Sequence, residues 1–269
     1  MGRILVCLLV GGFALTSKIG GEVRASPAAD GGSAKVLLLA DGVGDTAAAI
    51  EAPEFLAAEK KAERNEMVDK QIAARGVKDE RVLAALRAVP RHEFVPAELL
   101  RQAYEDRPLP IGHGQTISQP YIVGLMSELL EIGPEDRVLE VGTGSGYQAA
   151  IVAQLARETV SIEIVGALAQ RAARKLGSLG YRNLTVLHGD GYFGHEAQAP
   201  YDAIIVTAAA EHIPPPLIAQ LKPNGRMVIP VGRRAWTQNL ILVEKDEMGK
   251  VSTRNILAVR FVPFTRKKR

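Results

Sequence analysis

The chain has 269 residues, of which 47% are hydrophobic and 23% charged, and its net charge is +3. This length fits one large domain with extensions or two small domains, and the composition excludes a disordered chain, a collagen-like repeat and a disulfide scaffold. The small charge excess predicts no broad phosphate-binding face. Cys7 is the single cysteine, and no His lies at zinc-ligand spacing from it or from another His. We therefore expect no metal site and no nucleic-acid partner.

The first 25 residues differ from the rest of the chain. Arg3 precedes an apolar run over residues 4–15, and Val23-Arg24-Ala25 fits signal-peptidase cleavage after Ala25. The run is too short to span a bilayer as a stable helix. The pattern predicts either an exported protein whose leader, residues 1–25, is removed, or a start codon placed too early. Residues 26–61 lack sustained periodicity and are predicted to be a linker or a loosely ordered extension.

Three helices are predicted before the first strong strand. Apolar residues at helical spacing predict one helix that ends at Gly76, a second that Asp79 caps and Pro90 stops, and a third that starts near Gln119 and stops at residues 133–134. Together these helices form an N-terminal helical part over residues 62–133.

Strands and helices then alternate. The predicted strands span residues 137–141, 159–164, 184–187, 203–206, 226–231, 240–243 and 256–262, and the predicted helices span 147–156, 165–176 and 217–221. Such alternation is typical of a mostly parallel sheet with helices on both faces. The sequence therefore predicts an α/β, doubly wound, Rossmann-like core over residues 134–265. A basic tail, residues 266–269, is expected to be solvated.

A glycine-rich turn joins the first of these strands to the following helix. Residues 140–147 read Glu-Val-Gly-Thr-Gly-Ser-Gly-Tyr, and the glycines permit a tight turn and a close approach of a ligand to the backbone. The dinucleotide-binding fingerprint would place its third glycine at position 147, where this chain has Tyr147. Glu140 would repel a pyrophosphate, which seeks the positive end of a helix. A carboxylate suits the ammonium and sulfonium groups of S-adenosylmethionine (SAM).

Two more acids follow the next two strands. Glu163 can accept both hydroxyls of a ribose, and Asp190, beside Gly191, can accept an adenine amino group. Singly, the glycine turn can be mere packing, Glu163 a solvated strand end and Asp190 a turn former. Together, three acids at the ends of three successive strands predict SAM binding. The predicted cofactor ligands of this region are Glu140, Gly142, Thr143, Gly144, Gly146, Glu163, Asp190 and Gly191.

A set of short segments carries a family likeness: residues 89–91, 94–95, 109–112, 114–121, 137–148, 188–191, 201–208, 221–225, 230–232 and 260–263. Through them the chain resembles, from about residue 64 to about residue 265, the protein-L-isoaspartate O-methyltransferase family. The glycine turn is common to SAM-dependent methyltransferases, whereas the stretch Gln-Thr-Ile-Ser-Gln-Pro at 115–120 is much more specific to this family.

The resemblance implies an activity and a fold variant. The family transfers a methyl group from SAM to the α-carboxylate of L-isoaspartyl residues in damaged proteins, and the ester closes to a succinimide whose hydrolysis returns some normal aspartate. The family fold implies an antiparallel strand near the C-terminus. Because the accepting carboxylate has a reference pKa of about 3.5–4, it is ionised at neutral pH and needs no general base.

Ser118 is the candidate residue for orienting that carboxylate. From the residues alone it is equally an ideal N-cap for a helix that begins at Gln119 with Pro120 in its first turn. The resemblance implies the active-site role, and both roles can hold together. Thr116 and Ile117, in the same loop, are expected to border the methyl end of the cofactor.

Three rival functions remain at this point. One is a SAM-dependent methyltransferase that acts on RNA or a small molecule, for which the basic tail would be the support. Another is a dinucleotide-dependent oxidoreductase, which Tyr147 and Glu140 oppose. The third is a non-catalytic SAM-binding protein. The resemblance implies a cytoplasmic monomer with no stable membrane association once a leader is removed, whereas residues 1–25 point to periplasmic export.

Overall fold

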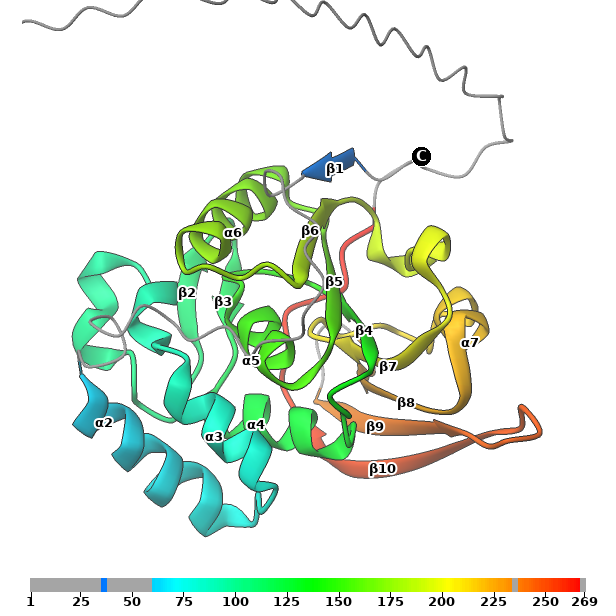
Figure 1. The fold of residues 1–269 in the computed structure, drawn as a ribbon, viewed down its shortest axis with the longest axis horizontal. Coiled ribbons are helices and arrows are strands. Elements are labelled where there is room, and N and C mark those ends of the chain that lie inside the picture. Colours follow the sequence, from blue (N-terminus) through cyan, green and yellow to red (C-terminus); the bar gives the residue numbers. More distant parts are fainter. Residues whose placement is uncertain (1–34, 38–59, 234–236, 267–269) are drawn as a thin grey trace, which may run out of the picture. The chain divides into compact units, whose positions relative to one another are not determined.

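A mixed, eight-stranded sheet organises the chain in a computed structural model (Figure 1). The structure describes residues 35–37, 60–233 and 237–266, all of them in one compact unit, Gly32–Arg269. The predicted leader, residues 1–25, lies outside the described residues. In order across the sheet the strands are β1 (Lys35–Leu37), β6 (Leu184–His188), β5 (Glu158–Glu163), β4 (Arg137–Val141), β7 (Tyr201–Val206), β8 (Leu221–Val231), β9 (Gln238–Lys245) and β10 (Val251–Val259).

The strand directions confirm the doubly wound prediction. Strands β6, β5, β4, β7 and β8 run parallel, and β9 is antiparallel to β8, as the family resemblance implied. The chain proceeds from β4 through β5 to β6 on one side and then crosses to β7 on the other side of β4. This reversal opens a crevice at the carboxyl ends of the central strands, where ligands of such sheets bind.

Helices and a hairpin surround the sheet. The helices are α2 (Lys61–Glu66), α3 (Glu80–Ala88), α4 (Pro120–Leu129), α5 (Tyr147–Leu155), α6 (Gly166–Ser178) and α7 (Pro215–Gln220). Strands β2 (Leu109–Gly112) and β3 (Gln115–Ile117) pair as a separate hairpin, and the short helical turn η5 (Gly191–Phe193) follows β6. The hairpin was not predicted, because three- and four-residue strands leave no clear alternation in the sequence.

Local signals predicted two helix boundaries correctly. The Asp79 side chain accepts hydrogen bonds from the backbone N–H groups of Arg81, at 2.8 Å, and Val82, at 3.4 Å, and so caps α3 as expected. Gly76 has φ +102° and ends the first helical segment. That segment continues beyond α2 as a π-helix, η1 (Met67–Ile72), which no residue pattern indicated.

Two stretches near the ends of the chain differ from the predicted elements. Part of the predicted linker, Lys35–Leu37, is the edge strand β1, antiparallel to β6, and the rest of it up to residue 59 is outside the described residues. The last strand covers Val251–Val259 rather than 256–262. Residues 260–266, which we call the C-terminal segment, leave the sheet instead, because Val262 and Phe264 pair through their backbones with Ala209.

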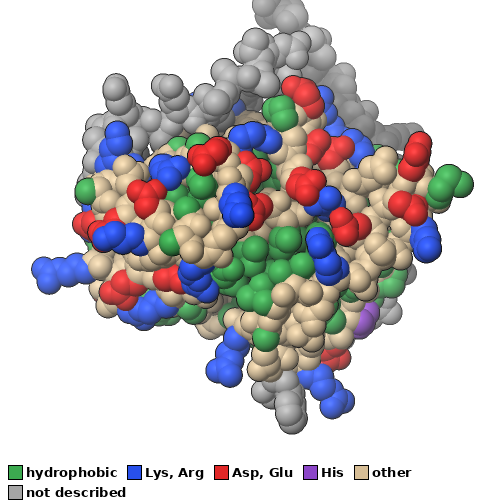
Figure 2. All heavy atoms as spheres, turned by 90° about the horizontal axis from the view of Figure 1, so that it is seen from below, with side chains coloured by type: hydrophobic (Ala, Val, Ile, Leu, Met, Phe, Trp, Pro, Cys, Tyr) green, Lys and Arg blue, Asp and Glu red, His purple; other side chains and the backbone are tan. Residues whose placement is uncertain are grey.

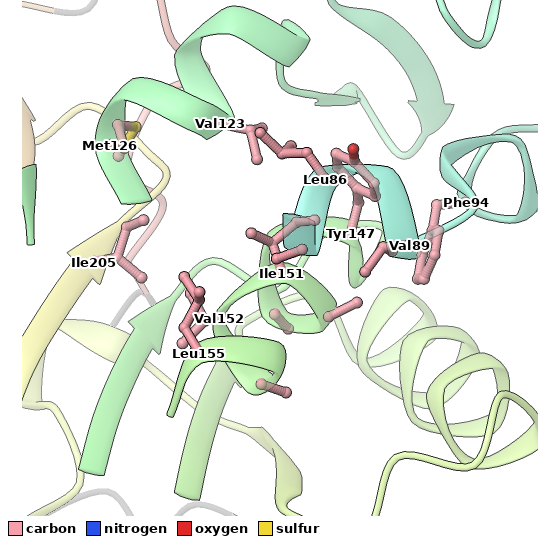
Figure 3. Close-up of a cluster of buried hydrophobic side chains, with 14 of the residues drawn as sticks. Leu86, Val89, Phe94, Val123, Met126, Tyr147, Ile151, Val152, Leu155 and Ile205 are labelled. Carbon is pink, nitrogen blue, oxygen red and sulfur yellow. The ribbon is translucent and has the colours of Figure 1, made fainter. Parts of the chain in front are cut away.

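The N-terminal helices pack on the first core helix (Figure 3). Leu86 of α3 and Val123 of α4 lie in one cluster with Tyr147 and Ile151 of α5, and each is at most 1% exposed. Full burial of such a side chain contributes about 1.5–3 kcal/mol. The helical part is therefore continuous with the core, and it carries the loop before α4 to the carboxyl edge of the sheet.

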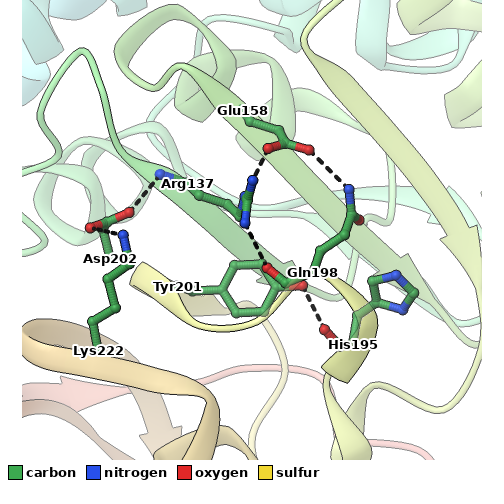
Figure 4. Close-up of polar contacts among 7 residues, drawn as sticks. All are labelled: Arg137, Glu158, His195, Gln198, Tyr201, Asp202 and Lys222. Atoms are coloured by element: carbon green, nitrogen blue, oxygen red, sulfur yellow. Dashed lines mark hydrogen bonds and ion pairs between the residues drawn. The ribbon is translucent and has the colours of Figure 1, made fainter.

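Polar contacts connect the amino ends of the central strands (Figure 4). Arg137, at the start of β4, donates from Nε to Glu158 Oε2 at 2.7 Å and from Nη1 to the Gln198 carbonyl at 3.1 Å. Its backbone N–H donates to Asp202, which also accepts from Lys222 at 2.7 Å. These pairs fix the amino ends of the strands and leave the carboxyl ends to form a site.

The described residues contain neither a candidate membrane span nor a candidate metal cluster. In this part of the chain no helix is both long and apolar enough to cross a membrane. The same residues contain no group of three or more His, Cys, Asp and Glu arranged to hold a metal ion.

Candidate active site

A cleft of about 750 Å³, partly open to solvent, lies at the carboxyl ends of the central strands. Of the predicted site residues, it is lined by Thr116, Ile117, Ser118, Gly142, Thr143, Gly144, Glu163 and Gly191. Glu140, Gly146 and Asp190 lie just outside this lining. The fold thus brings most of the predicted residues into one cavity.

The glycine turn has a backbone that requires glycine. Gly142, Gly144 and Gly146 have φ of +103°, +54° and +91°, in the left-handed region. A Cβ on Gly142 would lie 2.4 Å from Thr207 Oγ1, and a Cβ on Gly191 would lie 2.4 Å from Val141 Cγ1. The turn is therefore a close-packed cradle whose backbone forms the floor of the cleft.

Glu163 holds this turn from the neighbouring strand. Its Oε2 accepts from the backbone N–H of Gly144 and its Oε1 from that of Val165, both at 2.8 Å. The carboxylate is 5% exposed and still lines the cleft. Each carboxylate oxygen retains a lone pair for a further donor, so the residue can hold the turn and accept a ribose hydroxyl.

Glu140 lies beneath the cleft rather than on its wall. It is fully buried, and its Oε2 accepts a hydrogen bond from Ser161, whose hydroxyl also contacts Thr143. Burial raises the pKa of Glu140 to about 8; the Ser161 hydrogen bond lowers it, and the nearby charge of Glu163 raises it further. Its Oε1 has no hydrogen-bond partner among the described residues. The sequence argument assumed a carboxylate that faces the ligand, whereas this one is fully buried, lies outside the cleft lining and bonds Ser161 of the neighbouring strand.

Asp190 is engaged by its own chain. Its Oδ1 accepts from the Tyr192 backbone N–H at 3.1 Å, and its Oδ2 accepts from Arg266 Nε at 2.9 Å. Of the predicted solvated tail, Arg266 is 43% exposed and is also paired with Asp190, and residues 267–269 are outside the described residues. The neighbouring Gly191 supplies the cleft wall at this point.

Ser118 is not the cap of α4. The helix begins at Pro120, its N-cap position is Gln119, and no side chain of that cap position bonds the first turn. Asp106, from the preceding loop, accepts from the Tyr121 backbone N–H at 3.1 Å and from Gln119 Nε2 at 2.7 Å. The capping interpretation of Ser118 was wrong, because an acid distant in sequence takes that role and leaves the serine at the cleft.

A buried arginine supports the serine from behind. Arg91 is fully buried, donates from Nη2 to the Ser118 carbonyl at 2.7 Å and from Nε to the Ala103 carbonyl at 2.8 Å, and lies 4.9 Å from the Tyr147 ring centre. Burial lowers the pKa of Arg91 to about 10, so it stays charged at neutral pH. Arg91 thus joins the serine loop to the residue that follows the glycine turn.

The sequence reasoning missed several residues of the cleft. Thr207 follows β7 and donates from Oγ1 to the Gly142 carbonyl at 2.6 Å, which holds the turn from the side opposite Glu163. Its position at a strand end was the available signal. Residues 262–265 of the C-terminal segment form another part of the wall, and they were missed because they were assigned to a strand or left at the end of the domain.

The residues present fit SAM. The glycine cradle admits a ligand close to the backbone, Glu163 offers acceptor positions to hydroxyl groups, and Glu140 lies buried beneath the turn with its Oε1 unpartnered among the described residues. A ligand that is cationic and carries no phosphate suits this set. Phosphate would meet the acid Glu163 here, with no basic side chain in the cleft lining.

Comparisons with known proteins show the family of this chain. A family model described as protein-L-isoaspartate(D-aspartate) O-methyltransferase matches residues 62–269. Protein-L-isoaspartate O-methyltransferase 2 of Polaromonas sp. is 64% identical over 187 residues, which are 70% of this chain and 89% of the relative. Protein-L-isoaspartate O-methyltransferase 1 of Cupriavidus necator is 61% identical over 189 residues, 70% of this chain and 73% of the relative.

Solved structures share the fold. A protein-L-isoaspartate O-methyltransferase aligns with TM-score 0.68 and 30% identity over 74% of this chain and 65% of its own. A Plasmodium falciparum chain assigned to the same enzymes, in complex with S-adenosyl-L-homocysteine (SAH), aligns with TM-score 0.66 and 24% identity over 76% of this chain and 99% of its own. The family model and the sequence relatives establish the relationship: this chain belongs to the protein-L-isoaspartate(D-aspartate) O-methyltransferase family.

Proposed function

We propose that this protein transfers the methyl group of SAM to the α-carboxylate of L-isoaspartyl residues in damaged peptides and proteins. Family membership and the 64% identity to the Polaromonas enzyme support this activity. The complex of the Plasmodium relative with SAH, the product that SAM leaves, supports SAM as the methyl donor. Methylation starts repair, because the following backbone nitrogen attacks the ester carbonyl, expels methanol and closes a succinimide.

One observation carries the proposal: Ser118 and the glycine turn line the same cleft. A methyl acceptor beside Ser118 can therefore meet a donor that lies on the turn. Bound SAM supplies an activated methyl group on its sulfonium. The protein has to bring a carboxylate oxygen in line behind that methyl, about 3 Å away, and to exclude water.

We assign the roles of the site residues on this basis. The Ser118 hydroxyl donates a hydrogen bond that orients the substrate carboxylate, and Thr116 and Ile117 border the methyl end of the cofactor. Since the carboxylate is already ionised, no side chain need remove a proton. Charge is neutralised as the methyl moves, so a dry cleft favours the transition state.

The remaining residues assigned to cofactor binding line the cleft or lie beside its lining. We assign cofactor binding to Glu140, Gly142, Thr143, Gly144, Gly146, Glu163, Asp190 and Gly191. Glu140 would act from beneath the turn rather than by direct contact, since it lies outside the lining. We also propose residues 62–265 as the methyltransferase domain, with a helical part at 62–133 and a core at 134–265. The contacts of Arg266 extend this domain by one residue.

The test uses SAM with a labelled methyl group and two peptides that differ only in Asp or isoAsp. Base-labile label on the isoAsp peptide alone is expected. Label on neither peptide, with SAM still bound, would contradict the substrate and redirect the search to RNA and small molecules.

Ser118→Ala tests the assigned role. We expect turnover to fall by about 100-fold, the typical loss when a reacting group is misplaced by about 1 Å, while the Kd for SAH changes by less than about threefold. Ser178→Ala, the same change at an exposed position of α6, is the matched control. Unchanged turnover in S118A would remove Ser118 from the mechanism.

We further propose that the protein acts in the cytoplasm as a monomer, without nucleic acid or stable membrane association. The face in Figure 2 supports the absence of a nucleic-acid partner, because acidic and basic side chains are interspersed around a central apolar area. Mass spectrometry of the native N-terminus and sedimentation of the purified chain test the first two points. A chain that starts at Ser26 would contradict the cytoplasmic location.

A further inference from the structure

The C-terminal segment forms one wall of the cleft without belonging to the sheet. In Figure 1 it is the red trace that leaves β10 and runs back along the sheet. Residues 262–265 line the cleft. Ala209 anchors the start of the segment: its N–H donates to the Val262 carbonyl at 2.9 Å, and its carbonyl accepts from the Phe264 N–H at 2.8 Å.

A side chain anchors the far end of the segment. Within the described part of the chain, Phe264 is the last residue whose backbone bonds another element. Beyond it, Arg266 donates from Nε to Asp190 Oδ2 at 2.9 Å. Its guanidinium carbon lies 3.6 Å from the centre of the Tyr192 ring and 5.1 Å from that of Phe193. The arginine thus combines an ion pair with aromatic stacking, which suits the planar guanidinium.

These contacts join two walls of the same cavity. Asp190 and Tyr192 flank Gly191, which lines the same cleft as the C-terminal segment. Asp190 is also a residue to which the proposed function assigns cofactor binding. A ligand that enters or leaves between these walls has to separate them, and the contacts of Arg266 resist that separation.

We propose that Arg266 is a positioning residue for the cofactor: by pairing with Asp190 and stacking on Tyr192 it holds the C-terminal segment against η5 and sets the rate at which SAM enters and SAH leaves. The proposal rests on the proposed function, in that the cleft is taken to bind SAM. Arg266 does not touch the reacting atoms and acts through the wall that it fastens.

The test is the exchange kinetics of radiolabelled SAH on the full chain, by rapid filtration and by chase with unlabelled SAH. We expect Arg266→Ala to raise both the association and the dissociation rate constants by about tenfold, as the loss of one ion pair and one cation–π contact implies. The Kd then changes by less than about threefold. Arg266→Lys, which keeps the charge and loses the planar stack, should give intermediate rates.

Two further variants make the result specific. Arg254→Ala removes the same charge from an exposed position of β10 and should leave both rates unchanged. Tyr192→Leu should accelerate exchange, and adding it to R266A should have little further effect, because the two residues form one contact.

Unchanged rates in R266A would overturn the inference, as would faster dissociation with unchanged association, since that pattern means a lost ligand contact rather than an opened wall. If the wild type binds SAH and R266A shows either of these two patterns, this inference fails and the proposed function stands. A wild-type chain that binds no SAH would contradict the proposed function and the inference with it.

Discussion

The buried guanidinium of Arg91 donates a 2.7 Å hydrogen bond to the backbone carbonyl of Ser118, 27 positions further along the chain. The loop between β3 and α4 is therefore held by a buried side chain rather than by the helix that follows it. A charged donor with two buried carbonyl acceptors is a strong restraint, because removing it leaves the acceptors without partners. The position of the serine thus depends on a residue that lines no part of the cleft.

Replacing Arg91 should affect stability and catalysis together. Arg91→Met leaves the Ser118 and Ala103 carbonyls without this donor, and we expect a loss of about 3–5 kcal/mol, from two hydrogen bonds to a charged group. Arg91→Lys should keep part of the stability while turnover of an isoAsp peptide falls about tenfold and SAH affinity changes less. Chemical unfolding, peptide kinetics and calorimetry measure these effects.

The surface variant Arg87→Met is the matched control, because Arg87 pairs with Asp69 on the surface. It should cost at most about 1 kcal/mol and leave turnover intact. Wild-type kinetics in R91K would mean that Arg91 has no part in placing Ser118.

Glu163 should matter for cofactor affinity, since it holds the glycine turn through the Gly144 N–H and also lines the cleft. Glu163→Ala is expected to weaken SAH binding by about 10- to 100-fold, which corresponds to one hydrogen bond to a charged group. Isothermal titration calorimetry measures the Kd for SAH in each variant. Glu158→Gln, at the other end of the same strand, should stay within about twofold of the wild type; equal losses in both variants would point to general loosening of β5.

The glycine turn offers a comparison in which backbone strain is held constant. Gly142 and Gly76 have nearly the same φ, +103° and +102°, but a Cβ would strike Thr207 at 2.4 Å in the first case and meets nothing within 4 Å in the second. We expect Gly76→Ala to cost about 1 kcal/mol of stability and to leave SAH binding unchanged. Gly142→Ala should lose SAH binding as well, because the turn has to move. Similar behaviour of the two variants would argue against a close-packed cradle.

Stability should vary with pH through Glu140. Its pKa is raised from an ordinary value of 4.5 to about 8 by burial, so between these values the folded state keeps a proton that the unfolded state has lost. Stability from this group therefore declines as pH rises from about 4.5 to about 8 and stays low above that. In Glu140→Gln the site is neutral at every pH.

The melting temperature of E140Q minus that of the wild type should thus increase from pH 5 to pH 8 and then level off. Thermal melts of the two proteins in matched buffers measure this difference, without cofactor. A difference that does not change with pH would mean that Glu140 is ionised throughout in the folded protein.

Much of the core could be predicted from the sequence because its signals are local. Near-continuous apolar runs defined β6 and β7, Asp79 marked the start of α3, and the three glycines of the turn required a backbone that other residues avoid. Since parallel strands share one carboxyl edge, strand order along the chain was enough to bring Glu163 and the glycine turn together.

Other features depended on contacts between residues far apart in the chain. Asp106 rather than Ser118 caps α4, Arg91 reaches the Ser118 carbonyl, and Arg266 meets Asp190. No periodicity records such pairs, because each is set by where separate elements dock. The burial of the Glu140 side chain is likewise set by tertiary structure, since strand register decides which face of the sheet a side chain occupies. Residue patterns specify elements and the edge where they end, whereas packing specifies which side chains are left free to act.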